Sequence, residues 1–131
     1  MQAVARGALI ATLIPALAGC YSVVKIPEVA SASVYGPGIS GGALRAQQVA
    51  QLSDWLKAHD AGWRAPMGTP PRSITMAIVM RRAGGPQSTL DLFAWNDGSA
   101  MAYLYAPAPA SPRERYLPAA DVAALRAAVG H

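Results

Sequence analysis

The stretch Ser88–Tyr105, STLDLFAWNDGSAMAYLY, decides the fold of this chain. Asn96-Asp97-Gly98 separates two runs of strand-forming residues, and Asp-Gly suits a two-residue primed turn. The pattern predicts a hairpin with strands over 88–95 and 99–105. With Asp97-Gly98 at the tip, one face becomes continuously apolar. The expected facing pairs on it are Ala94 with Met101, Leu92 with Tyr103 and Leu90 with Tyr105.

The segment before the hairpin predicts a third strand. Apolar and small or polar residues alternate over 73–80, and Gly84-Gly85-Pro86 then turns the chain. We therefore expect a three-stranded antiparallel meander. Val23–Ile26 and Ser33–Tyr35 have strand composition, and a fourth, N-terminal strand stays open as an alternative. Residues 106–112 are rich in Pro and Ala and are expected to be extended.

Two helices are expected around the meander. The first covers 43–60, with Ser40 as a candidate cap and Gly62 as a candidate stop. Its apolar face holds Leu44, Val49, Leu52, Trp55, Leu56 and His59. The second has Pro118 as its first residue, ends at Gly130 and carries the stripe Val122, Leu125 and Val129. With both helices on the apolar sheet face, the prediction is a small α+β two-layer sandwich.

An apolar run at the N-terminus predicts export. Arg6 precedes about eleven residues, Ala8–Ala18, which is the length of a signal-peptide core. A membrane-spanning helix needs about twenty. The run ends in Leu17-Ala18-Gly19-Cys20, which resembles the lipobox of bacterial lipoprotein precursors. The resemblance covers residues 1–20 and implies cleavage before Cys20, a diacylglyceryl group on its sulfur and acylation of the new amino group.

The resemblance also implies a location. In the enterobacterial class an Asp after the cysteine retains a lipoprotein at the inner membrane. Here the residue is Tyr21, so the outer membrane is expected, with the protein facing the periplasm. The expected organisation is a signal peptide over 1–19, a lipidated tether over 20–39 and one domain over 40–131. Cys20 is the only cysteine, so its lipidation leaves no thiol for a disulfide or for catalysis.

Composition restricts the classes of partner. Removing residues 1–19 from 131 leaves 112, enough for one domain, and removing Arg6 lowers the net charge from +4 to +3. The basic residues are scattered, with close pairs only at Arg81-Arg82 and Arg113/Arg115. A nucleic-acid surface needs a denser basic stripe with interleaved aromatics, so no nucleic acid is expected as a partner.

Residues that could carry catalysis are few. His59 is the only histidine besides His131, the last residue, and we expect a half-buried ring at a helix end rather than a general base or metal ligand. The carboxylates do not form a pair suited to acid and base roles. Met76, Met80 and Met101 would suit copper(I), but their alternation favours core positions. We expect no cofactor, no metal and no enzymatic activity.

Loop residues are the best candidates for binding a partner. Trp63-Arg64 lies in the loop Gly62–Pro71, and Trp95 adjoins the hairpin tip. The leading interpretation is a domain that binds a protein partner or an envelope component. One alternative is an inhibitor or immunity-type lipoprotein that inserts a loop into an envelope hydrolase. Another is an enzyme with dispersed residues, such as His59 with Asp91 or Glu114.

Overall fold

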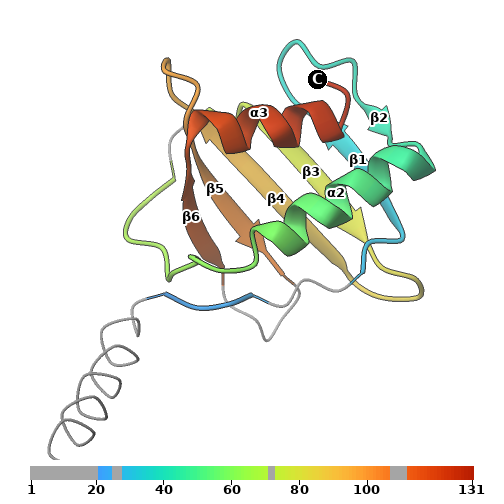
Figure 1. The fold of residues 1–131 in the computed structure, drawn as a ribbon, viewed down its shortest axis with the longest axis horizontal. Helices are drawn as coiled ribbons and strands as arrows, with labels where there is room; N and C mark the ends of the chain where they lie inside the picture. The colour runs from blue at the N-terminus through green and yellow to red at the C-terminus, as the bar shows by residue number, and fades with distance from the viewer. Residues whose placement is uncertain (1–20, 25–27, 71–72, 107–111) are drawn as a thin grey trace, which may run out of the picture.

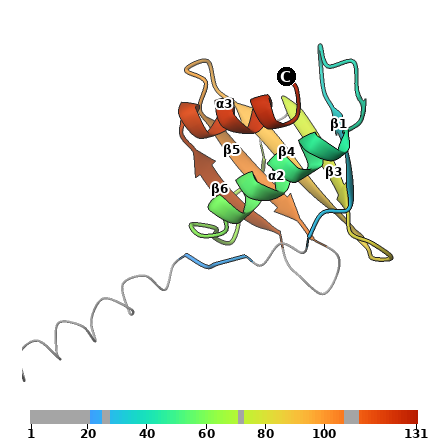
Figure 2. The ribbon, with the colours of Figure 1, turned by 45° about the vertical axis from the view of Figure 1, so that its right-hand side comes forward.

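The architecture is an antiparallel sheet of six strands in the spatial order β2-β1-β3-β4-β5-β6. It is seen in a computed structural model that describes residues 21–24, 28–70, 73–106 and 112–131. The strands are β1 (Ser31–Tyr35), β2 (Gly42–Ala43), β3 (Met76–Arg81), β4 (Gln87–Ala94), β5 (Ala100–Tyr105) and β6 (Arg113–Leu117). Helices α2 (Ala46–Ala58) and α3 (Ala119–Ala128) lie side by side over one face, the helix face (Figures 1 and 2). The α+β class is therefore confirmed.

The predicted three-stranded meander is wrong, because strands extend it on both sides. The alternative of a fourth, N-terminal strand is confirmed for Ser33–Tyr35, which belongs to β1 and pairs with β3. At the other side β6 pairs with β5. Its sequence Arg-Glu-Arg-Tyr-Leu lacks apolar alternation, because an acidic residue takes one of its buried positions. The domain thus includes residues that the sequence suggested as tether.

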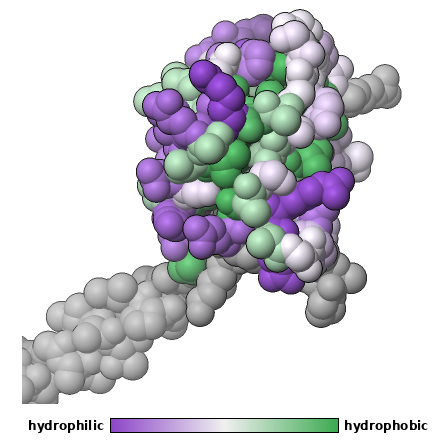
Figure 3. Space-filling view, turned by 90° about the vertical axis from the view of Figure 1, so that its right-hand side faces the viewer, coloured by the Kyte–Doolittle hydropathy of each residue, from purple (hydrophilic) through white to green (hydrophobic). Residues whose placement is uncertain are grey.

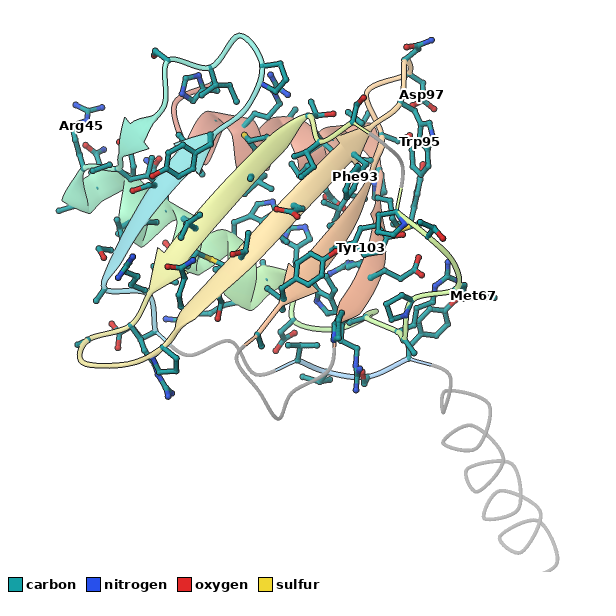
Figure 4. All side chains as sticks on the ribbon, turned by 180° about the vertical axis from the view of Figure 1, so that it is seen from behind. Arg45, Met67, Phe93, Trp95, Asp97 and Tyr103 are labelled. Carbon is teal, nitrogen blue, oxygen red and sulfur yellow. The ribbon has the colours of Figure 1, made fainter. Side chains whose placement is uncertain are left out.

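The predicted two-layer sandwich does not match the structure either. The segment after α2 passes the outer edge of β6, where Arg64 and Glu114 exchange backbone hydrogen bonds. It continues to the sheet face that carries no helix, and Met67 N–H there donates to the Glu114 carboxylate. Figure 4, drawn from this side, shows Met67 beside the sheet edge. This second face, the open face, is therefore partly covered by a loop.

The β4–β5 turn contains one residue more than predicted. Trp95 N–H donates to the Ser99 carbonyl at 2.9 Å and Gly98 N–H to the Trp95 carbonyl at 3.1 Å. Gly98 has φ +88°, while among the described residues only glycines have positive φ. This is a type I turn followed by a glycine bulge, a three-residue alternative to the primed turn.

The longer turn changes the register, so the predicted pairing is wrong. The observed partners are Ala94 with Ala100, Leu92 with Ala102 and Leu90 with Leu104. Since side chains alternate between faces, a shift of one residue turns β5 over. Its small and buried residues, Ala100 and Ala102, now lie on the helix face. Its larger residues, Met101 and Tyr103, lie on the open face.

The predicted apolar faces of the other elements are confirmed. The core contains Leu52, Trp55 and Leu56 of α2, Met76, Ile78 and Met80 of β3, and Val122, Leu125 and Val129 around α3. Helix α2 begins at Ala46 rather than Ala43, because Gly42–Ala43 instead pairs with β1 as β2. Pro118 caps α3 rather than starting it. Met76 and Met80 are buried core residues, which supports the packing interpretation over copper binding.

The first described residues are bound to the domain. Ser22 N–H donates to the Trp63 carbonyl at 2.7 Å, and Trp63 N–H returns a bond of 3.3 Å to the Ser22 carbonyl. Val24 N–H donates to the Asp60 carbonyl at 2.8 Å. The lipobox and Cys20 lie outside the described residues. Within the described part, none of the helices has the length and hydropathy to span a bilayer.

Candidate interaction surface

Trp63 is a core residue rather than a surface residue. Its side chain is fully buried, and its indole N–H donates to the His59 carbonyl at 2.8 Å. The same carbonyl accepts a bond of 2.9 Å from the Arg115 guanidinium. The indole therefore closes the C-terminal end of α2, where backbone carbonyls lack helical partners. It presents no exposed surface to a partner in this structure.

Arg64 is held by a buried carboxylate. Its guanidinium lies 3.5 Å from the carboxylate of Glu114, whose side chain is almost fully buried. Glu114 also accepts the Met67 N–H. A buried charge is costly unless it is paired and hydrogen-bonded, and these two contacts supply both. Glu114 therefore fastens the loop that starts at Arg64 onto the open face.

Tyr103 adjoins this acidic group on the open face. It lies opposite Glu114 in the β5–β6 pairing. Burial, followed by the negative charge of Glu114, raises the pKa of the Tyr103 phenol. Its ring meets Phe93 edge to face, with 5.3 Å between centroids, and stacks with Tyr105 at 6.5 Å. Both geometries are favourable for aromatic pairs, so these three residues form a packed aromatic group on the open face.

Trp95 is exposed at the same side of the sheet. It closes the β4–β5 turn, and 47% of its surface is exposed, compared with 52% for Tyr116 of β6. The two ring centroids are 6.2 Å apart and the planes are tilted by 34°. Between these residues and Phe93, Met101 is half-buried and pairs with both Phe93 and Tyr116. We call Trp95, Met101 and Tyr116 the aromatic edge; Figure 4 labels Trp95 at its rim.

Hydrogen bonds in the turn hold Trp95 in place. The carboxylate of Asp97 accepts the Ser99 N–H at 2.9 Å and also the Ser99 hydroxyl. The bond from the Ser99 side chain, followed by that from its backbone, lowers the pKa of Asp97. The hairpin tip projects from the body of the domain (Figure 1). Because the turn is already ordered, binding through it costs little additional entropy.

His59 lies on the other side of the sheet. Its ring stacks on Trp55 with centroids 4.0 Å apart, Nδ1 lies 2.7 Å from the Trp55 carbonyl and Nε2 lies 3.4 Å from the Asp121 carboxylate. Asp91 and Glu114 project from the open face, so the sheet separates them from His59. The dispersed active site that combined these residues is therefore not assembled. Across the described ranges no cluster of three metal-ligating side chains occurs.

Asp91 is half-buried near the middle of the open face. Burial raises the pKa of its carboxyl group. It pairs across the strands with Tyr103 on one side and Ala77 on the other. Burial and then the charge of Asp91 raise the pKa of the Tyr105 phenol. Among the residues that the structure describes, no cation pairs with Asp91, so burial makes its negative charge unfavourable for the fold.

The opposite side of the domain offers a contrast to the aromatic edge. Figure 3 faces this side, where hydrophobic residues gather in the middle between hydrophilic ones. Tyr35 of β1 is 50% exposed, and none of the aromatic stacking contacts includes it. Ile39 and Leu44 are partly buried and pack on the core.

A comparison of the chain with protein-family models, curated proteins and solved structures found no match.

Proposed function

We propose that this protein is an envelope lipoprotein whose domain binds a protein partner through the aromatic edge. The lipid on Cys20 would hold it at the outer membrane, facing the periplasm, as the lipobox resemblance implies. The domain would act by binding rather than by catalysis. The observation that carries the binding part is the half-exposed pair of Trp95, at the ordered β4–β5 turn, and Tyr116, in β6, whose ring centroids are 6.2 Å apart.

The energetics support such a role. Large aromatic side chains bury roughly 150–250 Å² each. Covering the exposed halves of Trp95 and Tyr116 would therefore remove about 200 Å² of surface from water and contribute about 5 kcal/mol. Trp and Tyr are also the residues most often found at binding hot spots. The polar and exposed Asn96 and Asp97 beside them are suited to the rim of such an interface.

Photo-crosslinking on the full lipidated protein tests this proposal. A benzoylphenylalanine residue at position 116 should give a discrete protein adduct in intact cells, and the same residue at position 35 should not. The partner identified from the adduct should bind the Trp95→Ala and Tyr116→Ala variants, which carry no crosslinker, at least tenfold more weakly, since a hot-spot residue contributes about 2 kcal/mol or more. Tyr35→Ala is the matched control, because Tyr35 is equally exposed. Equal losses for all three variants would contradict the proposal.

A second function is an inhibitor or immunity-type lipoprotein. The projecting and internally bonded tip at Asp97–Ser99 favours it, because a rigid loop can enter the cleft of a hydrolase. The loop Gly62–Pro71 is a weaker candidate, since Trp63 is buried and Arg64 is paired. The identity of the crosslinked partner distinguishes the two functions. A hydrolase whose activity falls on adding this protein and recovers with Asp97→Ala would favour inhibition.

A further inference from the structure

The first described residues set the distance between the anchor and the domain. If the whole segment 20–39 were a free extended tether, it would reach about 65 Å at about 3.4 Å per residue. The bonds of Ser22 and Val24 to the loop after α2 remove that freedom. Only Tyr21 then separates Cys20 from Ser22, the first bonded residue, and these two chain steps span about 7 Å. The domain cannot stand clear of a membrane to which Cys20 is anchored.

The short connection determines which end of the domain meets the membrane. Residues 21–24 run beneath the start of β6, and the β3–β4 turn lies at the same end of the strands, on the other side of the sheet (Figures 1 and 2). Tyr21 and Val23 are 56% and 61% exposed, although they adjoin bonded residues. Tyrosine is a favoured residue at membrane interfaces, where its ring is apolar and its hydroxyl stays hydrated.

The charged residues at this end are mainly basic. Arg81 and Arg82 are exposed and begin the β3–β4 turn, and the half-buried Arg113 begins β6. The acids Glu28 and Asp60 lie near the same end, where Ala30 bonds to Arg81 and Asp60 bonds to Val24. Of the described residues named here, three are arginines and two are acids, a difference of one positive charge that favours anionic lipid headgroups within a Debye length.

We infer that this end of the domain rests directly on the membrane surface, with Tyr21 and Val23 in the interfacial layer. The inference rests on the proposed lipidation of Cys20. The β4–β5 turn lies at the opposite end of the sheet from the β3–β4 turn, and β4 contains eight residues. At about 3.3 Å per residue, the aromatic edge would stand about 25 Å above the membrane end. It would thus face a partner in the periplasm.

A lipid-crosslinking experiment tests the orientation. The lipidated protein is reconstituted in vesicles of phosphatidylethanolamine and phosphatidylglycerol, with benzoylphenylalanine replacing either Ala83 in the β3–β4 turn or Asp97 at the far tip. Position 83 is distant from Cys20 in sequence, so its reaction with lipid reports the orientation of the domain. We expect several-fold more lipid adduct at position 83 than at position 97. Equal yields at the two positions would overturn the inference.

Proline variants test whether residues 22–24 impose this orientation. Ser22→Pro with Val24→Pro removes the two N–H donors to the Trp63 and Asp60 carbonyls. The lipid adduct at position 83 should fall several-fold towards the yield at position 97. Ser22→Ala with Val24→Ala is the control, because it changes the same two positions but keeps both backbone N–H donors, and it should keep most of the yield. An unchanged yield in the double proline variant would overturn the inference.

A linker variant covers the possibility that the prolines unfold the domain. A flexible Gly/Ser segment inserted between Cys20 and Tyr21 lengthens the connection and leaves the hydrogen bonds intact. It should also lower the adduct at position 83, and an unchanged yield would again count against the inference.

Metabolic labelling with palmitate, with Cys20→Ala as the negative control, tests the anchor separately. Labelled protein with equal adducts at positions 83 and 97 refutes the orientation alone, whereas unlabelled protein refutes the proposed anchor.

Discussion

Replacing Trp63 by Ala tests whether this residue serves the fold or a partner. The side chain is fully buried among core residues, and its N–H donates to the His59 carbonyl. Its backbone also binds Ser22. The substitution leaves a cavity at the junction of α2, the following loop and the N-terminal segment. If Trp63 were instead a surface anchor, the change would weaken binding and leave the folded domain intact.

The expected cost can be estimated from the burial. Removing a fully buried Trp side chain typically destabilises a protein by about 3–5 kcal/mol. A domain of this size has a total stability of about 5–15 kcal/mol. Trp63→Ala should therefore remove a large fraction of the stability and lower Tm by about 10–25 °C. Trp63→Phe keeps most of the volume and loses one neutral hydrogen bond, so about 1–2 kcal/mol is expected.

Urea unfolding followed by far-UV circular dichroism measures these differences on the chain that begins at Tyr21. Trp95→Ala is the matched control, since it makes the same chemical change at a half-exposed site. It should cost less than about 1 kcal/mol, the range of ordinary surface substitutions. If Trp63→Ala changed the free energy of unfolding no more than Trp95→Ala does, the assignment of Trp63 to the core would be refuted.

Three further substitutions test particular features of the structure. Gly98→Ala forces φ +88° on a residue with a Cβ and should cost about 1–2 kcal/mol in urea unfolding, whereas Gly68→Ala, with no positive φ and open space, should be nearly neutral. Glu114→Ala removes the buried acceptor of two groups and should cost about 3 kcal/mol, with faster proteolysis of the loop after Arg64; an undisturbed loop would contradict the role of Glu114. Burial raises the pKa of Asp91 from its ordinary value of 3.8, so its carboxyl group keeps its proton to a higher pH in the native state than in the unfolded state. The stability of the domain therefore falls as the pH rises from the unfolded-state pKa to the native-state pKa of Asp91. Asp91→Asn should remove this fall and stabilise the domain at pH 7, and a pH profile of Tm that is unchanged by the substitution would show otherwise.

Local pattern was enough to predict the helices and one face of β3. The apolar stripes at Leu52–Leu56 and Val122–Val129 face the core, because helical periodicity determines which side chains share a face. The alternation that includes Met76 and Met80 does the same for β3. In these elements each buried residue is apolar, so the pattern of apolar residues alone predicts which side chains are buried. The prediction does not depend on contacts with distant parts of the chain.

The hairpin shows where local pattern is insufficient. Asn96-Asp97-Gly98 is compatible with a two-residue primed turn and with a three-residue turn that has a glycine bulge. The two turns place opposite faces of β5 against the helices. Burial of Ala100 and Ala102 under the helices accompanies the longer turn. The small side chains of Ala100 and Ala102 allow the helices to pack closely on β5. This reason for choosing the longer turn depends on the helices, so it cannot be read from the hairpin sequence alone.

The candidate surface was only partly predictable. Trp95 was identified from its place beside the turn, but Tyr116 and the pairing of Arg64 with Glu114 were not. Strand β6 reads as polar, since its buried position is occupied by Glu114, whose charge is compensated by a residue fifty positions away in sequence. A buried charge of this kind depends on its partner, and a sequence pattern within one strand contains no information about that partner.

By itself, the sequence determined the α+β class, the apolar faces of both helices and of β3, and the resemblance at Cys20 from which the membrane address is proposed. These follow from periodicity and from short contiguous motifs, which act over a few residues. Only the tertiary structure decided that β1 and β6 extend the sheet, that β5 turns its alanines inward, that Trp63 is core and that residues 22–24 are bound to the domain. Each of these depends on contacts between segments far apart in the chain, whose free energy no local pattern contains.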